Sequence, residues 1–365
     1  MVLTTDQRVA AIAEFGFSER QARFLELVMR HAGVCVPRQY ARFAGIAHGG
    51  KKCNAFFDKL IRRGYAVACD CVHNRARLYH VRHRPLYDAI GEMDSRYRRP
   101  VPARRAVERL MLLDGVLATP SLNWITTNAE KARYFDALTT SADHPPLADD
   151  VADRPSTPPF GAVMGQFPIG LEPTGRAVFF FLALVPWTDE FRVFIQAHTK
   201  FLRAVRDWTL RLVFPRPLDR AYGDYVRVVY DELETPLHTA TVSERKWYFE
   251  HRRKAEAERS DSLTQAFLDR GAQVYSTSRF VLLYRRWQQH GDVVFDDASS
   301  PVLAEALANG SGRVECLVLP HSYRHLSPLV GLVRSTASGV EKGEHRGERS
   351  SAHSQPPAST PVSSR

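Results

Sequence analysis

The run of residues 176–185 restricts the fold of this chain more than any other segment. Its sequence, RAVFFFLALV, places apolar side chains at successive positions, so both faces of the strand that it predicts are apolar. Such a strand belongs in the middle of a sheet, buried on both sides, and Pro186 ends it. No apolar run reaches the roughly 18 residues needed to cross a bilayer, so we expect no membrane partner.

The residues on either side predict the rest of an α/β unit. Residues 160–163 and 166–171 are strand-like, Thr188 begins a helix that continues to residue 207, and residues 210–214 form the next strand. This order of strand, hairpin, central strand, helix and strand resembles the core of the restriction-endonuclease-like fold. We therefore expect an α+β protein whose α/β domain resembles a degenerate member of that fold.

The resemblance implies acidic residues that this chain lacks. Nucleases of that fold hold magnesium with an Asp that follows a Pro and with an (Asp/Glu)-x-Lys motif on the next strand. The matching places read FPIG at 167–170 and LAL at 182–184. We therefore expect no enzymatic activity, no catalytic residues, no metal ligands and no cofactor. A magnesium-dependent DNA nuclease that uses displaced acids, such as Glu172, Asp189 and Glu190, stays an alternative.

Positive charge is concentrated in the first 110 residues. The whole chain has 50 Lys and Arg against 40 Asp and Glu, a net charge of +10. Residues 1–110 alone carry a net charge of +11, and the remaining 255 residues carry −1. Because Lys and Arg release counterions from phosphates, a basic segment joined to a neutral body favours a polyanionic partner.

Three helices and a hairpin are predicted within this basic segment. Ser18 and Gln21 form a capping box, and the helix that follows ends at Gly33. Pro37 suits the first turn of a second helix over residues 38–44. A third helix over residues 51–63 has an apolar stripe and a basic face. Residues 65–71 and 77–81 then predict two strands joined by a turn at 73–75.

This order of helix, helix, basic helix and hairpin resembles the winged helix-turn-helix, most closely in the segment FFDKLIRRGYA. The resemblance implies that the third helix enters the major groove of double-stranded DNA and that the hairpin is a wing beside it. The side chains expected to contact DNA are basic or amide residues of these elements: Arg38, Lys51, Lys52, Asn54, Lys59, Arg62, Arg63, Arg75 and Arg77. A winged helix that binds protein instead stays an alternative, because a fold does not determine function.

The basic winged helix followed by an α/β domain resembles the plasmid replication-relaxation family over residues 15–220. This resemblance implies sequence- or structure-dependent binding of double-stranded DNA. The binding would serve maintenance, replication control or transfer of a bacterial plasmid or integrative mobile element. A homodimer, and a non-enzymatic adaptor for protein partners, are left open.

Composition divides the chain into four regions. We expect a winged helix-turn-helix domain at 1–100, a helical connector and Pro-rich linker at 101–159, an α/β domain at 160–334 and a disordered tail at 335–365. The first 15 residues lack the uninterrupted apolar run of a secretory signal, so we expect a cytoplasmic protein with reduced cysteines. The spacing of Cys69, Cys71 and His73 is too tight for the usual zinc knuckle.

Overall fold

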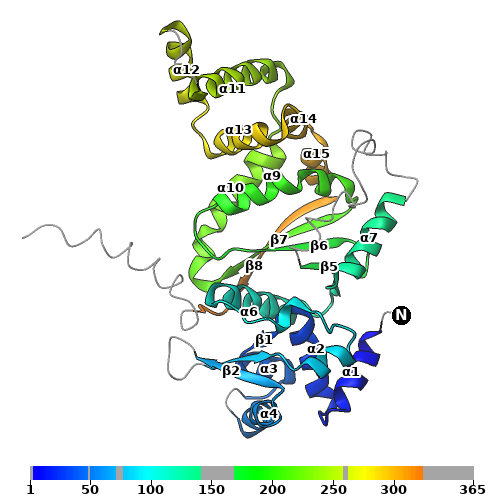
Figure 1. Ribbon diagram of the computed structural model, residues 1–365. Coiled ribbons are helices and arrows are strands. Elements are labelled where there is room, and N and C mark those ends of the chain that lie inside the picture. The colour runs from blue at the N-terminus through cyan, green and yellow to red at the C-terminus, as the bar shows by residue number, and fades with distance from the viewer. Residues whose placement is uncertain (1–2, 48–49, 71–76, 141–167, 258–261, 324–365) are drawn as a thin grey trace, which may run out of the picture.

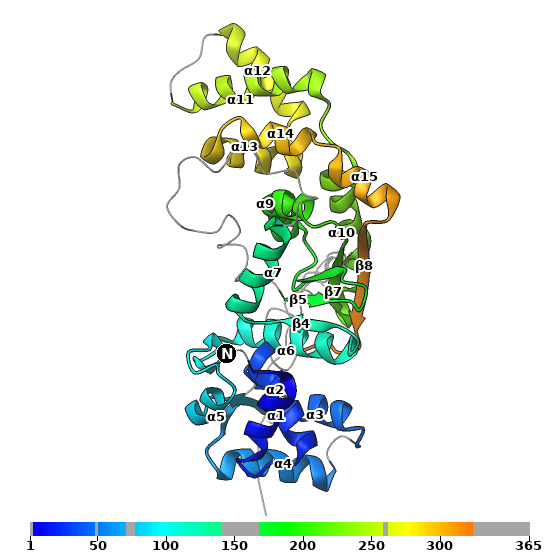
Figure 2. The same ribbon diagram turned by 90° about the vertical axis from the view of Figure 1, so that its right-hand side faces the viewer.

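The computed structural model describes residues 3–47, 50–70, 77–140, 168–257 and 262–323 (Figure 1). These residues form a mixed α+β fold with a three-stranded and a five-stranded sheet. The N-terminal helices lie at one end, the larger sheet lies in the middle, and the helices of residues 242–299 lie at the other end (Figure 1 and Figure 2). The turn at 73–75, the strand expected at 160–163, most of the Pro-rich linker and the expected tail lie outside the described residues.

The N-terminal elements follow the predicted order, with some additions. They are α1 (Thr5–Ala13), α2 (Glu19–His31), β1 (Val34–Cys35), α3 (Pro37–Ala44), α4 (Lys51–Arg62), β2 (Ala66–Asp70), β3 (Arg77–Val81) and α5 (Arg84–Ala89). The Ser18 hydroxyl accepts a hydrogen bond from the Gln21 N–H, and the Gln21 side chain accepts one from the Ser18 N–H, so the predicted capping box is confirmed. The helices α1 and α5 were not predicted, nor was the pairing of β1 with β3.

The five-stranded sheet is mixed. Its strands, in spatial order, are β4 (Asn123–Ile125), β5 (Ile169–Leu171), β6 (Ala177–Leu182), β7 (Trp208–Pro215) and β8 (Gly312–Leu319). The neighbours β4, β5 and β6 are antiparallel, whereas β6, β7 and β8 run parallel. The crossover between the parallel strands β6 and β7 contains α9 (Asp189–Ala204), as the sequence predicts.

The middle strand β6 is buried on both faces, which confirms the prediction from its apolar run. Val178 and Phe180 lie in one core with α6 (Ala103–Ala118) and the N-terminal helices. Ala177 and Phe179 lie in a second core with α9 and α10 (Tyr222–Val229). Since successive side chains of a strand point to opposite faces, each of the two cores takes alternate residues of β6.

Helix α6 is shared by the N-terminal elements and the sheet. It contacts α2, α3 and β1 as well as β6, β7 and β8. The approach to the sheet is close at Gly115, where a Cβ atom would lie 2.8 Å from Cε2 of Phe180. The predicted division at residue 100 therefore falls inside one continuous hydrophobic core. The predicted start of the α/β domain at residue 160 is too late, because β4 already pairs with β5.

An ion network joins α1 and α2 to the start of α7 (Asn128–Thr140). The Glu130 carboxylate lies 3.3 Å from Arg8 and 2.9 Å from Arg30, and it accepts hydrogen bonds at 3.0 Å from the backbone N–H groups of residues 126 and 127. Burial acts to raise the pKa of Glu130, but the two arginines and the backbone donors lower it from 4.5 to about 2. The carboxylate is therefore charged at neutral pH and ties three helices together.

Helices make up most of the remaining described chain. They are η1 (Arg96–Arg98), η2 (Arg216–Ala221), the π-helix η3 (Tyr230–Glu234), η4 (Thr239–Thr241), α11 (Val242–Ala257), α12 (Ser262–Val274), α13 (Ser278–His290), α14 (Val293–Ser299) and α15 (Val302–Asn309). The helices expected at 222–233 and 242–258 are confirmed, residues 280–287 are helical, and residues 314–319 are a strand. A separate core around Phe249 and Trp287 holds α11 to α14 together. Within the described ranges, no helix is both long and apolar enough to cross a membrane.

Candidate nucleic-acid interface

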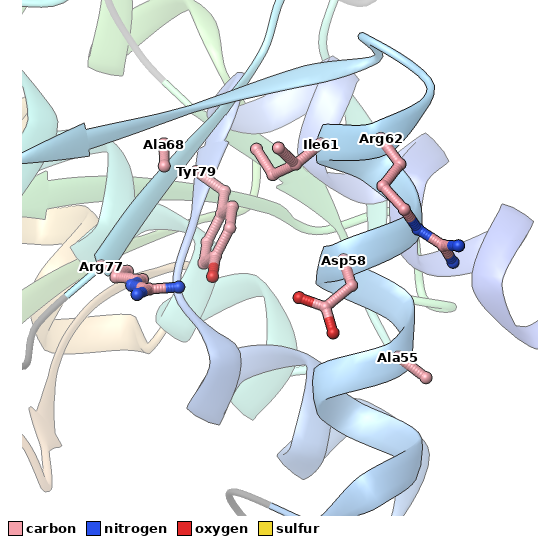
Figure 3. A pocket seen from close by; sticks show the side chains of 7 residues that line it. All are labelled: Ala55, Asp58, Ile61, Arg62, Ala68, Arg77 and Tyr79. Carbon is pink, nitrogen blue, oxygen red and sulfur yellow. The ribbon is translucent and has the colours of Figure 1, made fainter.

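A groove lies between α4 and the β2–β3 hairpin (Figure 3). Its volume is about 440 Å³. The residues that line it are Ala55, Asp58, Ile61 and Arg62 of α4 and Ala68, Arg77 and Tyr79 of the hairpin. The groove therefore joins the two elements in which the sequence places most of the expected DNA contacts.

Packing determines which face of α4 is exposed. The buried residues of the helix recur at helical spacing and are Cys53, Phe56, Phe57 and Leu60. Phe56 stacks on Tyr40 of α3 with the ring centroids 4.2 Å apart, and Phe57 packs on Tyr79 of β3 at 4.3 Å. These aromatic contacts hold α4 against α3 and the hairpin, and they leave its polar face in solvent.

Strand pairing places Arg77 beside that polar face. β2 and β3 pair from Ala66 opposite Val81 to Asp70 opposite Arg77, so Arg77 is the first residue of β3. Its side chain is exposed. Figure 3 shows Arg77 and Asp58 pointing toward each other across the groove, whereas the guanidinium of Arg62 points outward from the helix.

Four of the predicted contact residues are exposed and have a charged side chain without a partner among the described residues. Lys51, Lys52, Arg62 and Arg77 are exposed, and they take part in none of the hydrogen bonds or ion pairs formed within the described part of the chain. Their charges therefore remain available for phosphate groups. Asn54 is exposed on the same helix. Arg75, which the sequence analysis expected in the turn between the two strands, lies outside the described residues.

Lys59 and Arg63 are held by the segment that joins α1 to α2. The Lys59 ammonium donates a hydrogen bond to the carbonyl of Gly16 and lies 4.8 Å from the centroid of the Phe17 ring. Arg63 Nη1 donates to the carbonyl of Phe15 at 2.9 Å. Burial lowers the pKa of Lys59, and the neighbouring Arg63 lowers it further. Both side chains thus fasten the end of α4 to the segment that joins α1 to α2, and their contact with DNA stays a prediction.

The side chain of Arg38 also has a partner within the fold. Its two terminal nitrogens donate to the two carboxylate oxygens of Asp114 on α6, at 2.8 and 2.7 Å. The Tyr323 hydroxyl donates to the same carboxylate, and the Arg38 guanidinium lies 5.3 Å from the centroid of the Tyr323 ring. Burial acts to lower the pKa of Arg38, but Asp114 raises it overall. The Arg38 side chain thus joins α3 to α6, and its expected contact with DNA stays a prediction.

Two polar residues of this surface were missed by the sequence analysis. Arg42 is exposed in the last turn of α3 and forms no ion pair with the described residues. Asp58 lines the groove itself. Its position one helical turn after Asn54 and one turn before Arg62 was the available signal, because residues four apart share a helix face.

Of the acids considered for a displaced nuclease site, Glu172 lies at the other end of β6 from Asp189 and Glu190. Glu172 precedes β6 at one end, where its backbone forms a turn with Gly175, and Asp189 begins α9 beyond the other end. A six-residue strand such as β6 is roughly 20 Å long. In the described part of the chain, no group of three or more His, Cys, Asp and Glu side chains could hold a metal ion.

Comparisons of this chain with protein-family models, with curated proteins and with solved structures give no match. A function for this chain is therefore inferred from the geometry of its own residues.

Proposed function

We propose that this chain binds double-stranded DNA with a winged helix-turn-helix, in which α4 enters the major groove and the β2–β3 hairpin is the wing. The observation that carries the proposal is that the cations on and beside α4 differ in their partners, and that two of those without a partner among the described residues, Arg62 and Arg77, line the groove. Within the described residues, Lys51, Lys52, Arg62 and Arg77 are exposed and their side chains form no hydrogen bond or ion pair, whereas the side chains of Arg38, Lys59 and Arg63 each bind an acceptor elsewhere in the fold.

The dimensions of α4 support this mode of binding. The helix has 12 residues and is therefore about 18 Å long. The major groove of B-DNA, about 12 Å wide, admits an α-helix side-on. Lys51 and Lys52 open α4, where the free N–H groups and the positive end of the helix dipole also attract phosphate. Arg77 extends from the hairpin and would contact the backbone beside the helix.

We propose further that the activity is binding without catalysis. The separation of Glu172 from Asp189 by the length of β6 supports this, because a magnesium site needs its carboxylates within one coordination sphere. The biological role that we propose is maintenance, replication control or transfer of a plasmid or integrative mobile element. That role depends on the resemblance of the chain to the plasmid replication-relaxation family.

The test is the salt dependence of binding to a fluorescently labelled DNA duplex, measured by anisotropy with the full chain. Four phosphate contacts predict that the logarithm of the binding constant falls with the logarithm of salt concentration with a slope of about −3.6. Arg62→Gln should weaken binding and make the slope shallower by about 0.9. Arg63→Gln is the matched control, since the neighbouring Arg63 donates to Phe15 instead, and it should leave the slope unchanged.

Two results would contradict the proposal. Absent or salt-independent binding would exclude an electrostatic DNA interface. Equal changes of slope for Arg62→Gln and Arg63→Gln would show that the groove is not where the duplex lies, because the two charges would then act only through the net charge of the chain.

A further inference from the structure

Asp58 is an acid in the middle of an otherwise basic groove. It is exposed, it lines the groove with Arg62 and Arg77, and its carboxylate points into the space between α4 and β3 (Figure 3). Arg62 follows it by one helical turn, the spacing at which ion pairs form on helices. Nevertheless, Asp58 takes part in none of the ion pairs found among the described residues. The carboxylate is therefore available to a ligand.

A carboxylate in this place opposes binding to the DNA backbone. Phosphates repel the carboxylate, so the groove would attract nonspecific DNA more strongly without it. A hydrogen-bond donor on the DNA would offset this repulsion. In the major groove, the bases offer such donors as the amino groups of cytosine and adenine, while guanine and thymine present acceptors there.

The neighbouring atoms on the base edge distinguish cytosine from adenine. Beside its amino group adenine has the N7 acceptor, which repels the second oxygen of a carboxylate, whereas cytosine has no acceptor at that place. Asp58 lies mid-helix, with Lys51 and Lys52 at the start of α4 and Arg77 across the groove. These cations would hold the backbone on either side and leave Asp58 facing the base edges.

We propose that Asp58 is a specificity-determining residue that selects a cytosine in the major groove. This inference rests on the proposed function of DNA binding. It adds a sequence preference to an interface that the four cations alone would make indifferent to sequence.

The test is selection from a library of short duplexes with a randomised centre, using the full chain and its variants, followed by binding measurements on the selected duplexes. The unchanged chain should enrich cytosine at one position, and replacing that base pair should weaken binding about 5- to 150-fold. Asp58→Ala should lose the preference at that position alone. Asp58→Asn should change it to adenine, because an amide can donate to N7 and accept from the amino group.

A matched control is Asp88→Asn, since Asp88 is exposed on α5 and does not line the groove. It makes the same change of charge in the same region and should leave the cytosine preference intact, while both Asn variants bind nonspecific duplex somewhat more tightly. Circular dichroism spectra should be equal for all variants, because both side chains are on the surface.

The outcomes separate this inference from the proposed function. Salt-dependent binding without any base preference, or a cytosine preference that persists in Asp58→Ala, would overturn the role of Asp58 and leave DNA binding standing. A chain that binds no duplex would overturn both.

Discussion

Replacing the buried Asp114 by alanine should destabilise the folded chain by about 3–5 kcal/mol. The Asp114 side chain is fully buried, and that of Arg38 is only 19% exposed. The carboxylate accepts two hydrogen bonds from Arg38 and one from the buried Tyr323 hydroxyl. Removing it leaves a poorly solvated cation and a buried hydroxyl without partners, so the loss exceeds that of an exposed ion pair, which is about 1 kcal/mol or less.

A graded series identifies the origin of this loss. Asp114→Asn keeps the volume and one acceptor but removes the charge, so its effect should lie between that of Asp114→Ala and that of Tyr323→Phe. The last variant removes only one donor to a charged group and should cost about 1–2 kcal/mol. Burial and the Asp114 charge raise the pKa of Tyr323, so its hydroxyl remains protonated and able to donate at any pH used for the measurement.

The measurement is urea unfolding of the full chain, followed by far-ultraviolet circular dichroism, and Asp88→Ala is the surface control. A loss below about 1 kcal/mol for Asp114→Ala would refute the reasoning, because a pair of that strength behaves as solvent-exposed. A loss for Asp114→Asn as small as for the control would likewise show that the charge of Asp114 does not hold Arg38.

Two further predictions concern the ion network of Glu130 and the contact of Gly115 with Phe180. Because the pKa of Glu130 is about 2 in the folded chain and 4.5 when unperturbed, its contribution of about 3 kcal/mol is complete above pH 4.5 and is lost as the pH falls toward 2. Acid titration of the unfolding free energy should show this decline, and Glu130→Gln should flatten it. Gly115→Ala should cost about 1–3 kcal/mol in thermal unfolding, because the new methyl group meets the Phe180 ring. Gly223→Ala, with open space around its Cβ, is its control.

Elements with a clear period or a cap could be predicted from the sequence. The apolar run of β6 required a strand buried on both sides, and the structure places its alternate residues in two cores. Ser18 and Gln21 marked the start of α2, since a capping box is a local contact between residues three apart. By contrast, β4 has only three residues and no period, so the sequence did not reveal that the sheet begins before residue 160.

The residues of the candidate site were only partly predictable, because side chains of the same type form different contacts in the folded chain. Arg62 and Arg63 are adjacent and both basic, yet Arg62 has no hydrogen bond or ion pair with the described residues and Arg63 donates to a carbonyl nearly 50 residues earlier in the chain. Arg38 pairs with an aspartate 76 residues away. Such contacts follow from how helices pack, which the helical period alone does not specify. The same limit concealed Asp58, whose significance depends on the hairpin that faces it.

The position of α6 determines how the basic groove relates to the rest of the molecule. Leu110, Met111 and Leu113 of α6 are fully buried in the same core as α2 and β1, and Asp114 holds Arg38 of α3. A cut at residue 100 would remove this cover and expose the apolar side of the N-terminal helices. Through its contacts with β6, β7 and β8, α6 also fixes those helices to the sheet. A duplex bound by α4 would therefore be held in one orientation to the sheet, without the freedom that a flexible linker between two domains would give.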